Sequence, residues 1–94
     1  MTMELKNLVG DQWLSQNGQQ EYQIVNPADG RTVVARFRYS TDADVALAVQ
    51  AASNAFPDWR DTPIIKRCRI LFHCKELLEQ RLSEIATLLV SENG

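Results

Sequence analysis

Along the first 40 residues, short apolar runs alternate with polar positions and turn residues, which is the pattern of β-strands joined by tight turns. Residues 7–14 form a first extended run, and residues 21–25 form a second one. Asn17-Gly18 lies between them, and because both residues tolerate a positive φ, this dipeptide is a strong signal for a turn between strands. The sequence therefore predicts an N-terminal β-hairpin.

A third strand is predicted over residues 32–38, after a turn at residues 26–30. In that turn Pro27 fixes φ, and Gly30 permits a left-handed backbone position. Side chains alternate between the two faces of a strand, so one face of this strand is apolar and the other is expected to be wet. The apolar face carries Val33, Ala35 and Phe37.

From residue 41 the apolar period changes to that of a helix. Thr41 is the expected N-cap, with Asp42 and Asp44 in the first turn, where they meet the positive end of the helix. Pro57 is expected to end this helix, because the residue before a proline is pushed out of the α region. One helical face carries Val45, Ala48, Val49, Ala52 and Phe56.

A second helix is predicted to begin with Thr62 as N-cap and Pro63 at the first helical position, and to break near Arg81. Its main apolar stripe consists of Ile64, Cys68, Leu71 and Leu78, flanked by Ile65 and Phe72. Ile70 and Leu77 lie on nearly the opposite side. A helix that is apolar on two sides is expected to have neighbours on both.

A third helix is predicted over residues 82–94, with Asn93-Gly94 as its C-cap. Strands followed by helices indicate an α+β arrangement for the chain as an isolated fragment. Residues 1–94 contain no repeat and no Gly/Ser linker, so no internal domain boundary is expected.

Composition and charge narrow the classes of partner. The chain is 45% hydrophobic and 23% charged, which is ordinary for a globular protein, and its net charge of -2 argues against a general nucleic-acid binder. The longest apolar run, residues 45–49, is far shorter than the about 20 residues of a membrane span. The N-terminus has no apolar core typical of a secretory signal, so a cytoplasmic location is expected.

The cysteines and the histidine are too few and too dispersed to predict a reactive centre. Cys68 and Cys74 would lie roughly 9 Å apart on one helix, too far for a disulfide, so free thiols are expected. Cys68, His73 and Cys74 point about 120° apart from one another, so one metal ion cannot collect them and His73 cannot activate a thiol. Cys68 is expected to be a small buried apolar residue and His73 a surface residue.

Other candidate motifs also favour structural readings. The glycines, Gly10, Gly18, Gly30 and Gly94, cannot form a G-x-G-x-x-G loop or a P-loop. Residues 60–81 hold six bases and three acids, but the bases do not share one helix face, which favours a solvated surface. The sequence therefore predicts no catalytic, cofactor-binding or metal-binding residue in this chain.

Residues 56–79 carry a resemblance to a known family. They read FPDWRDTPIIKRCRILFHCKELLE, and this stretch resembles the N-terminal part of the aldehyde dehydrogenase superfamily. The wording WRDTP, R-x-R-I-L-F and KELLE looks most like the methylmalonate-semialdehyde dehydrogenase branch, which is CoA-acylating. Residues 24–56 and 82–94 are similar to the turn, strand and helices that flank this stretch in the family.

The resemblance implies that the chain, residues 1–94, has an α/β fold and is the incomplete opening part of an NAD-binding domain. In the family, the nucleophilic cysteine, the general-base glutamate and the cofactor glycines lie beyond the segment that corresponds to residues 1–94. The resemblance thus implies an oxidoreductase that uses NAD and CoA to convert methylmalonate or malonate semialdehyde to propionyl- or acetyl-CoA, to which this chain contributes scaffold only. The chain alone is expected to be inactive and to bind neither cofactor.

The expected partners are the remainder of an aldehyde dehydrogenase chain or its subunits, with no nucleic acid and no membrane, and the chain is expected to self-associate through exposed apolar helix faces. A second hypothesis stays open beside the first: a non-catalytic interaction module derived from such an enzyme, which associates with itself or with a full-length subunit. The second apolar side at Ile70 and Leu77 motivates it, because each such side chain left wet forgoes about 1.5–3 kcal/mol of burial.

Overall fold

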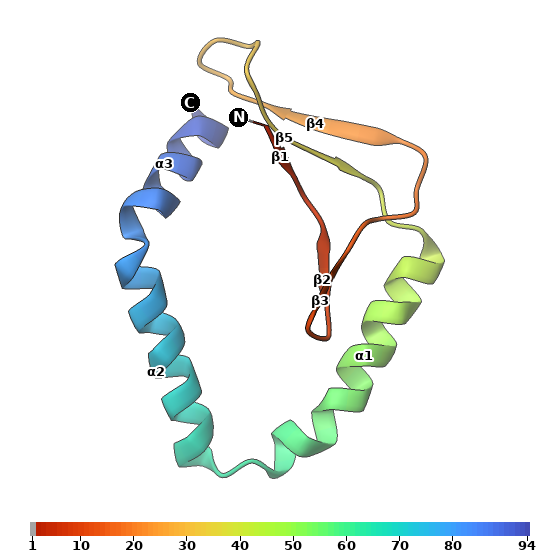
Figure 1. Ribbon diagram of the computed structural model, residues 1–94, viewed down its shortest axis with the longest axis vertical. Helices are drawn as coiled ribbons and strands as arrows, with labels where there is room; N and C mark the ends of the chain where they lie inside the picture. The colour runs from red at the N-terminus through yellow and green to blue at the C-terminus, as the bar shows by residue number, and fades with distance from the viewer. Residues whose placement is uncertain (1) are drawn as a thin grey trace.

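The computed structural model describes residues 2–94 as an open ring of elements, with the strands on one side and the helices around the rest (Figure 1). The strands come first in the chain and the helices follow, so the predicted order of elements in this α/β fragment is confirmed. The elements are β1 (Met3–Glu4), β2 (Asn7–Val9), β3 (Gln12–Leu14), β4 (Glu21–Val25), β5 (Val33–Arg38), α1 (Asp42–Asp61), α2 (Ile64–Gln80) and α3 (Leu82–Asn93).

The N-terminal hairpin exists, but the prediction of its position was wrong. Its strands are β2 and β3, which pair antiparallel with Val9 opposite Gln12, so the turn is Gly10-Asp11. Gly10 has a φ of 62°, and a glycine at the first central position is what a type II′ hairpin turn requires. Residues 7–14, expected to be one extended run, therefore fold back on themselves.

Gly18 is needed for a different reason from the one its sequence suggested. It does not have a positive φ. Instead, its N–H donates to the carbonyl oxygen of Tyr39 at 3.0 Å, and a Cβ at this position would overlap that oxygen. Gly18 thus lets the chain after β3 lie directly against the end of β5.

Replacing Gly18 with asparagine is expected to open this contact, because the new Cβ must displace backbone at a cost of roughly 1–3 kcal/mol. Amide hydrogen exchange at residue 18 should then be at least about tenfold faster. Gly10→Asn is the matched control: asparagine tolerates a positive φ and Gly10 has open space around it, so exchange at residue 18 should not change. Equal effects of the two substitutions would contradict the close-approach explanation.

The larger sheet has the strand order β1-β5-β4. β4 and β5 are antiparallel, with Tyr22 opposite Phe37 and Ile24 opposite Ala35, which confirms the predicted faces of both strands. The rings of Tyr22 and Phe37 lie 5.5 Å apart between centroids. β1 joins the other edge of β5 in parallel.

The turn between β4 and β5 occupies residues 26–30, as predicted, and Gly30 has a φ of 65°. The carboxylate of Asp29 accepts hydrogen bonds from the Thr32 hydroxyl and from the backbone N–H groups of Arg31 and Thr32. These donors lower the pKa of Asp29 to about 2, with the Thr32 hydroxyl as the largest cause. Asp29 therefore stays ionised and holds the turn closed.

Helix α1 begins as the sequence predicts. The Thr41 hydroxyl accepts a hydrogen bond from the N–H of Asp44 at 3.2 Å, and the Asp44 carboxylate accepts one from the N–H of Thr41 at 2.9 Å. Together they form a capping box, which satisfies two backbone donors at the helix start.

The end of α1 differs from the prediction, because Pro57 lies inside the helix. The helix continues for one more turn, to Asp61, and Thr62 then closes it: its N–H donates to the Trp59 carbonyl at 3.2 Å and its hydroxyl to the Asp58 carbonyl at 2.7 Å. Thr62 is therefore the C-cap of α1 and not the N-cap of α2, a role that falls to Pro63.

The boundary between α2 and α3 confirms the predicted break at Arg81, which has a φ of -108° and a ψ of 18°. The predicted C-cap is also confirmed: Gly94 has a φ of 79° and its N–H donates to the Val90 carbonyl at 2.8 Å. None of the helices formed by residues 2–94 is long and apolar enough to cross a membrane.

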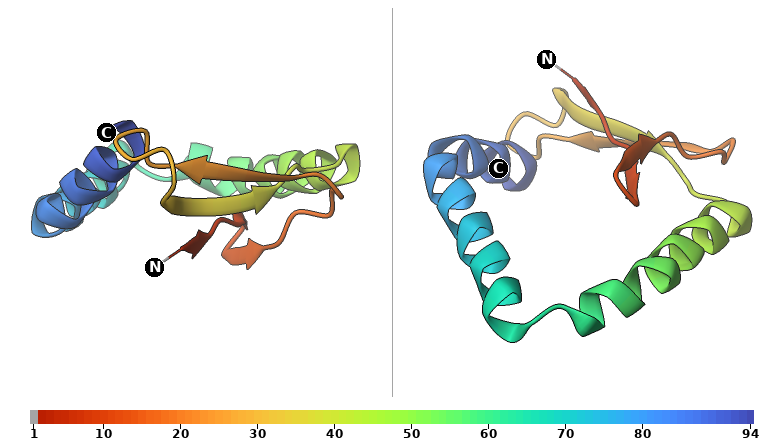
Figure 2. Two further views of the ribbon diagram at one scale, coloured as in Figure 1. Left: turned by 90° about the horizontal axis from the view of Figure 1, so that it is seen from above. Right: turned by 60° about the horizontal axis from the view of Figure 1, so that its bottom comes forward.

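The molecule is flat and loosely packed. Its extents are 48 × 35 × 16 Å. The left view of Figure 2, seen from above, shows how thin the molecule is along its shortest axis. The radius of gyration is 17.0 Å, against about 12 Å for a compact domain of this length. Among residues 2–94 only Ala35 is a buried apolar residue, with 2% of its surface exposed. The strands and helices thus do not enclose a core of their own.

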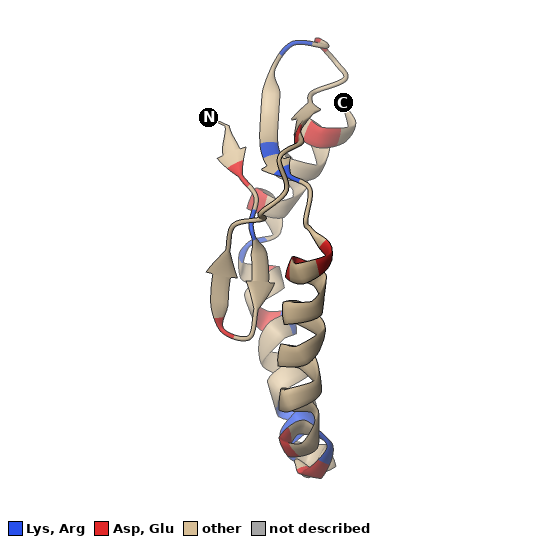
Figure 3. Cartoon of the chain, turned by 90° about the vertical axis from the view of Figure 1, so that its right-hand side faces the viewer, with Lys and Arg blue, Asp and Glu red and all other residues tan. Residues whose placement is uncertain are grey.

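Acidic and basic residues alternate along the chain and are not confined to separate elements. Figure 3 shows both signs spread along its length, at the sheet and at the end of the ring where α1 meets α2. Residues 45–57 of α1 carry no charge at all.

Candidate functional site

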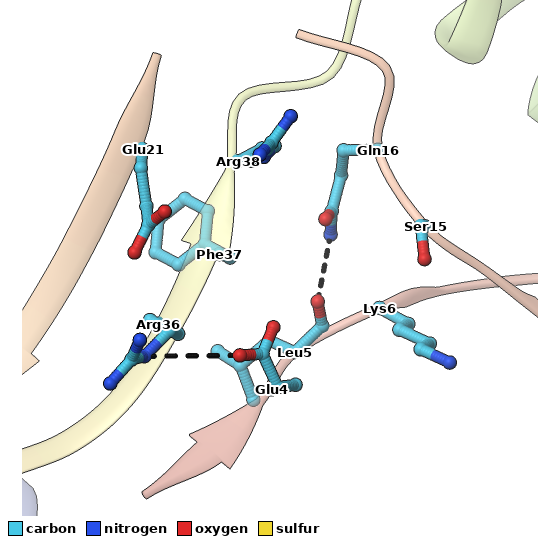
Figure 4. Close-up of a pocket in the computed structure, with 9 residues that line it drawn as sticks. All are labelled: Glu4, Leu5, Lys6, Ser15, Gln16, Glu21, Arg36, Phe37 and Arg38. Carbon is cyan, nitrogen blue, oxygen red and sulfur yellow. Dashed lines mark hydrogen bonds and ion pairs between the residues drawn. The ribbon is translucent and has the colours of Figure 1, made fainter. Parts of the chain in front are cut away.

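A polar cleft of about 320 Å³ lies where β1 and β5 approach the segment that follows β3 (Figure 4). It is lined by Glu4, Leu5, Lys6, Ser15, Gln16, Glu21, Arg36, Phe37 and Arg38. The carboxylate of Glu4 lies 3.8 Å from Nε of Arg36, and the side-chain amide of Gln16 donates to the Leu5 carbonyl at 3.2 Å. Both charged partners are exposed to solvent, so this ion pair contributes at most about 1 kcal/mol.

The cleft offers no activated nucleophile. Ser15 is the one hydroxyl in its lining, and a serine needs an adjacent base to attack a substrate. The chain's single histidine, His73, lies on α2, outside this lining. Three basic and two acidic side chains line the cleft and can hold a polar group there.

Cys68 and Cys74 have free thiols, as the sequence predicts. The expectation that Cys68 is buried was wrong, because both cysteines are exposed and residues 2–94 supply nothing that covers the stripe on which Cys68 lies. His73 is a surface residue as expected, with Nδ1 3.6 Å from the Glu76 carboxylate. Within residues 2–94, no three metal-binding side chains converge. The prediction that the chain contains no catalytic, cofactor or metal residue stays a prediction.

The backbone likewise provides no cradle for a phosphate group. Gly10, Gly30 and Gly94 have positive φ values, but each stands alone in a separate turn or cap. The start of α1 presents Asp42 and Asp44, which repel an anion, and α2 has Pro63 as its N-cap. Within residues 2–94, neither these glycine positions nor the starts of α1 and α2 form the backbone cradle of a phosphate-binding loop.

Asp44 ties the segment after β3 to the start of α1, a role that the sequence did not reveal. Besides capping the helix, its carboxylate accepts hydrogen bonds from the backbone N–H of Asn17 at 2.8 Å and from the Asn17 side-chain amide at 2.5 Å. The Asn17 backbone N–H, followed by the Thr41 N–H and the Asn17 side chain, lowers the pKa of Asp44 to about 2. Asn17 thus acts as a clamp residue and not as a hairpin residue.

The lowered pKa of Asp44 predicts an acid-sensitive clamp. The contribution of the carboxylate to stability is fully present above its ordinary pKa of 3.8 and is lost as the pH falls through about 2. In an NMR titration, the Asn17 amide signal should shift with a midpoint near pH 2, and Asp44→Asn should remove this shift. A midpoint close to 3.8 would show that the carboxylate is not held by these donors.

The candidate surface for binding a partner is apolar and lies on α2. We define its first side as Ile64, Cys68, Leu71 and Leu78, and its second side as Ile70, Cys74 and Leu77. Leu71 is 63% exposed, Ile64 68% and Ile70 48%. At about 100° per residue, the two sides and the flanking Ile65 and Phe72 leave a polar strip roughly 120° wide, which carries Lys66, Arg69, His73, Glu76 and Gln80.

Two apolar grooves lie elsewhere around the ring, away from α2. One, of about 460 Å³, lies between β2 and α1 and includes Leu8, Val45 and Val49. The other, of about 340 Å³, lies between β5 and α3 and includes Val34 and Leu88. The second apolar side of α2 could be predicted from helical spacing, whereas the grooves could not, because they need the positions of elements distant in the sequence.

The exposed area measures how much partner surface this arrangement can accept. The accessible surface is 7950 Å², against about 5,500 Å² for a compact protein of 10.7 kDa. The difference is roughly 2,400 Å². A standard protein–protein interface buries only about 800 Å² per partner, so the extra exposed area is closer to that of a domain whose core has been opened. Chemically, these exposed faces can dock against another apolar surface.

Comparison with known proteins gives this open shape a context. The chain is similar to malonate-semialdehyde dehydrogenase 1 of Geobacillus kaustophilus, with 47% identity over 93 residues, which is 99% of this chain and 19% of that relative. Malonate-semialdehyde dehydrogenase of Bacillus pumilus is 43% identical over 96% of this chain and 18% of its own length. The chain thus spans about a fifth of the curated relatives that it matches.

A solved structure matches in fold as well. The crystal structure of an NAD-dependent benzaldehyde dehydrogenase from Corynebacterium glutamicum superposes with a TM-score of 0.88 at 35% identity, over 94% of this chain and 19% of that one. The sequence model of the aldehyde dehydrogenase family matches residues 13–94, which is most of the chain. The resemblance found in residues 56–79 is thereby confirmed, and the chain belongs to the aldehyde dehydrogenase family.

Proposed function

We propose that this chain is the N-terminal scaffold segment of an NAD-dependent, CoA-acylating aldehyde dehydrogenase that acts on malonate or methylmalonate semialdehyde. The observation that carries the proposal is the alignment of 99% of the chain with 19% of a malonate-semialdehyde dehydrogenase. The segment opens the NAD-binding domain and contributes strands and helices to it. The exposed thiols suit a reducing, cytoplasmic compartment.

The residues present support a scaffold role for this chain, with the chemistry in the rest of the enzyme. The chain does not fit the phosphates of NAD or CoA, because its glycines stand alone and Asp42 and Asp44 occupy the start of α1. It also lacks a paired nucleophile and base. Cofactor binding and chemistry therefore belong to the larger part of the enzyme, and this segment supports that part by packing.

A hybrid enzyme tests the proposal. In the Geobacillus kaustophilus relative, the aligned 93 residues are replaced by this chain. We expect NADH formation with CoA and malonate semialdehyde within about tenfold of the parent enzyme, since a loss of one tenfold corresponds to only about 1.4 kcal/mol. The isolated chain should give no NADH above the enzyme-free rate. A folded hybrid without activity, or turnover by the isolated chain, would contradict the scaffold role.

One observation favours a second candidate function. The second side of α2 is exposed together with the first, as a self-associating interaction module requires. Sedimentation of the purified chain distinguishes the candidates. A stable dimer that binds no hydrophobic dye favours the module, whereas dye binding that persists at every concentration favours the scaffold segment.

A further inference from the structure

We propose that α2 is a two-sided docking element, clamped on both sides by the remaining four-fifths of an aldehyde dehydrogenase polypeptide, and that this remainder binds the chain even when supplied as a separate molecule. The inference rests on the proposed function and goes beyond it, because it assigns a non-covalent binding activity to this chain. It also names the surface responsible, which is the first and second sides of α2.

The geometry of α2 demands two covering layers. Its two sides are centred roughly 110° apart around the helix axis, and with the flanking Ile65 and Phe72 the apolar positions span an arc of roughly 240°, so one flat surface cannot cover them all. Cys68 belongs to the first side and Cys74 to the second, about 120° apart, and both are exposed. Each side therefore carries its own thiol, which can report whether that side is covered.

A second copy of the chain does not satisfy this geometry. In a two-fold dimer both copies use the same patch, so a single contact covers one side of α2 and leaves the other wet. A standard interface of about 800 Å² per partner would also cover only a third of the roughly 2,400 Å² excess. A larger body with two separate faces is needed.

The remainder of an aldehyde dehydrogenase meets that need in size and in shape. The solved relative contains about five times the length of this chain, and 94% of this chain superposes on it with a TM-score of 0.88. The open ring is therefore the conformation that the homologous segment adopts beside the rest of its own polypeptide. The occupant that fits α2 on both sides is that rest.

The test uses the Geobacillus kaustophilus relative from which the aligned residues are deleted, tagged and co-expressed with this chain. We expect co-elution at a one-to-one ratio. Alkylation by iodoacetamide, followed on the individual peptides by mass spectrometry, should slow at least about tenfold at both Cys68 and Cys74 relative to the free chain. Leu71→Asp, and separately Ile70→Asp with Leu77→Asp, should abolish co-elution, while Arg69→Asp on the polar strip should not.

Each outcome decides between the proposals. Protection of only one thiol, or co-elution that survives Ile70→Asp with Leu77→Asp, would overturn two-sided docking and leave the proposed function intact. Absence of co-elution beside an active hybrid enzyme would show that the two parts join only as one chain. Absence of co-elution beside an inactive hybrid would overturn both. Equal protection of both thiols in the free chain would assign the surface to self-association.

Discussion

The isolated chain is expected to bind a hydrophobic dye with roughly ten times the fluorescence that the hybrid enzyme produces per mole, because its apolar faces have no cover. Large apolar side chains of α2, including Ile64, Ile65 and Phe72, are each more than 60% exposed. Complete burial of one such side chain contributes about 1.5–3 kcal/mol, and a small domain's entire stability is about 5–15 kcal/mol. The chain forgoes many such contributions at once.

For the same reason, we expect the isolated chain to have a low free energy of unfolding, below about 5 kcal/mol, and to associate with itself increasingly as its concentration rises. Dye fluorescence and sedimentation measured at several concentrations check both effects. The hybrid enzyme is the control, since it contains the same residues in a covered setting. A monomeric chain that ignores the dye and unfolds cooperatively would contradict the prediction.

The second large effect is expected from Leu71→Ala in the hybrid enzyme. Leu71 lies at the centre of the first side of α2, and if that side is covered, truncation leaves a cavity and costs roughly 2–5 kcal/mol of unfolding free energy. In the isolated chain the same substitution should change stability by less than about 0.5 kcal/mol, because the side chain is already 63% exposed. The measurement is denaturant unfolding of both proteins.

Arg69→Ala provides the matched control two residues away. Arg69 lies on the polar strip of α2 and is exposed, so its truncation should change stability by less than about 0.5 kcal/mol in both proteins. If Leu71→Ala and Arg69→Ala cost the same in the hybrid enzyme, the first side of α2 is not an interface.

The predictions that were confirmed depend on residues that lie close together in the sequence. The capping box at Thr41, the break at Arg81 and the cap at Gly94 depend on residues a few positions apart, so the sequence displays them directly. The faces of β4 and β5 follow from strict alternation and were predicted for the same reason.

The predictions that failed depended on contacts between distant residues or on competing local signals. Asn17 and Gly18 resemble a hairpin turn, yet they are held by Asp44 and Tyr39, which lie more than 20 positions away. Pro57 resembles a helix end, but Thr62 caps the helix one turn later. The spacing of apolar residues in α2 could predict that this helix needs neighbours on two sides. Only the structure could show that residues 2–94 do not provide those neighbours.

Hydrogen exchange along α2, measured in the isolated chain and in the hybrid enzyme, tests most directly whether this chain provides a surface that the rest of the enzyme completes. The account predicts that amides of residues 68–78 exchange roughly a hundredfold more slowly in the hybrid, because covered helices open far less often. Equal and strong protection in the isolated chain would contradict it, because α2 would then be stable without any partner.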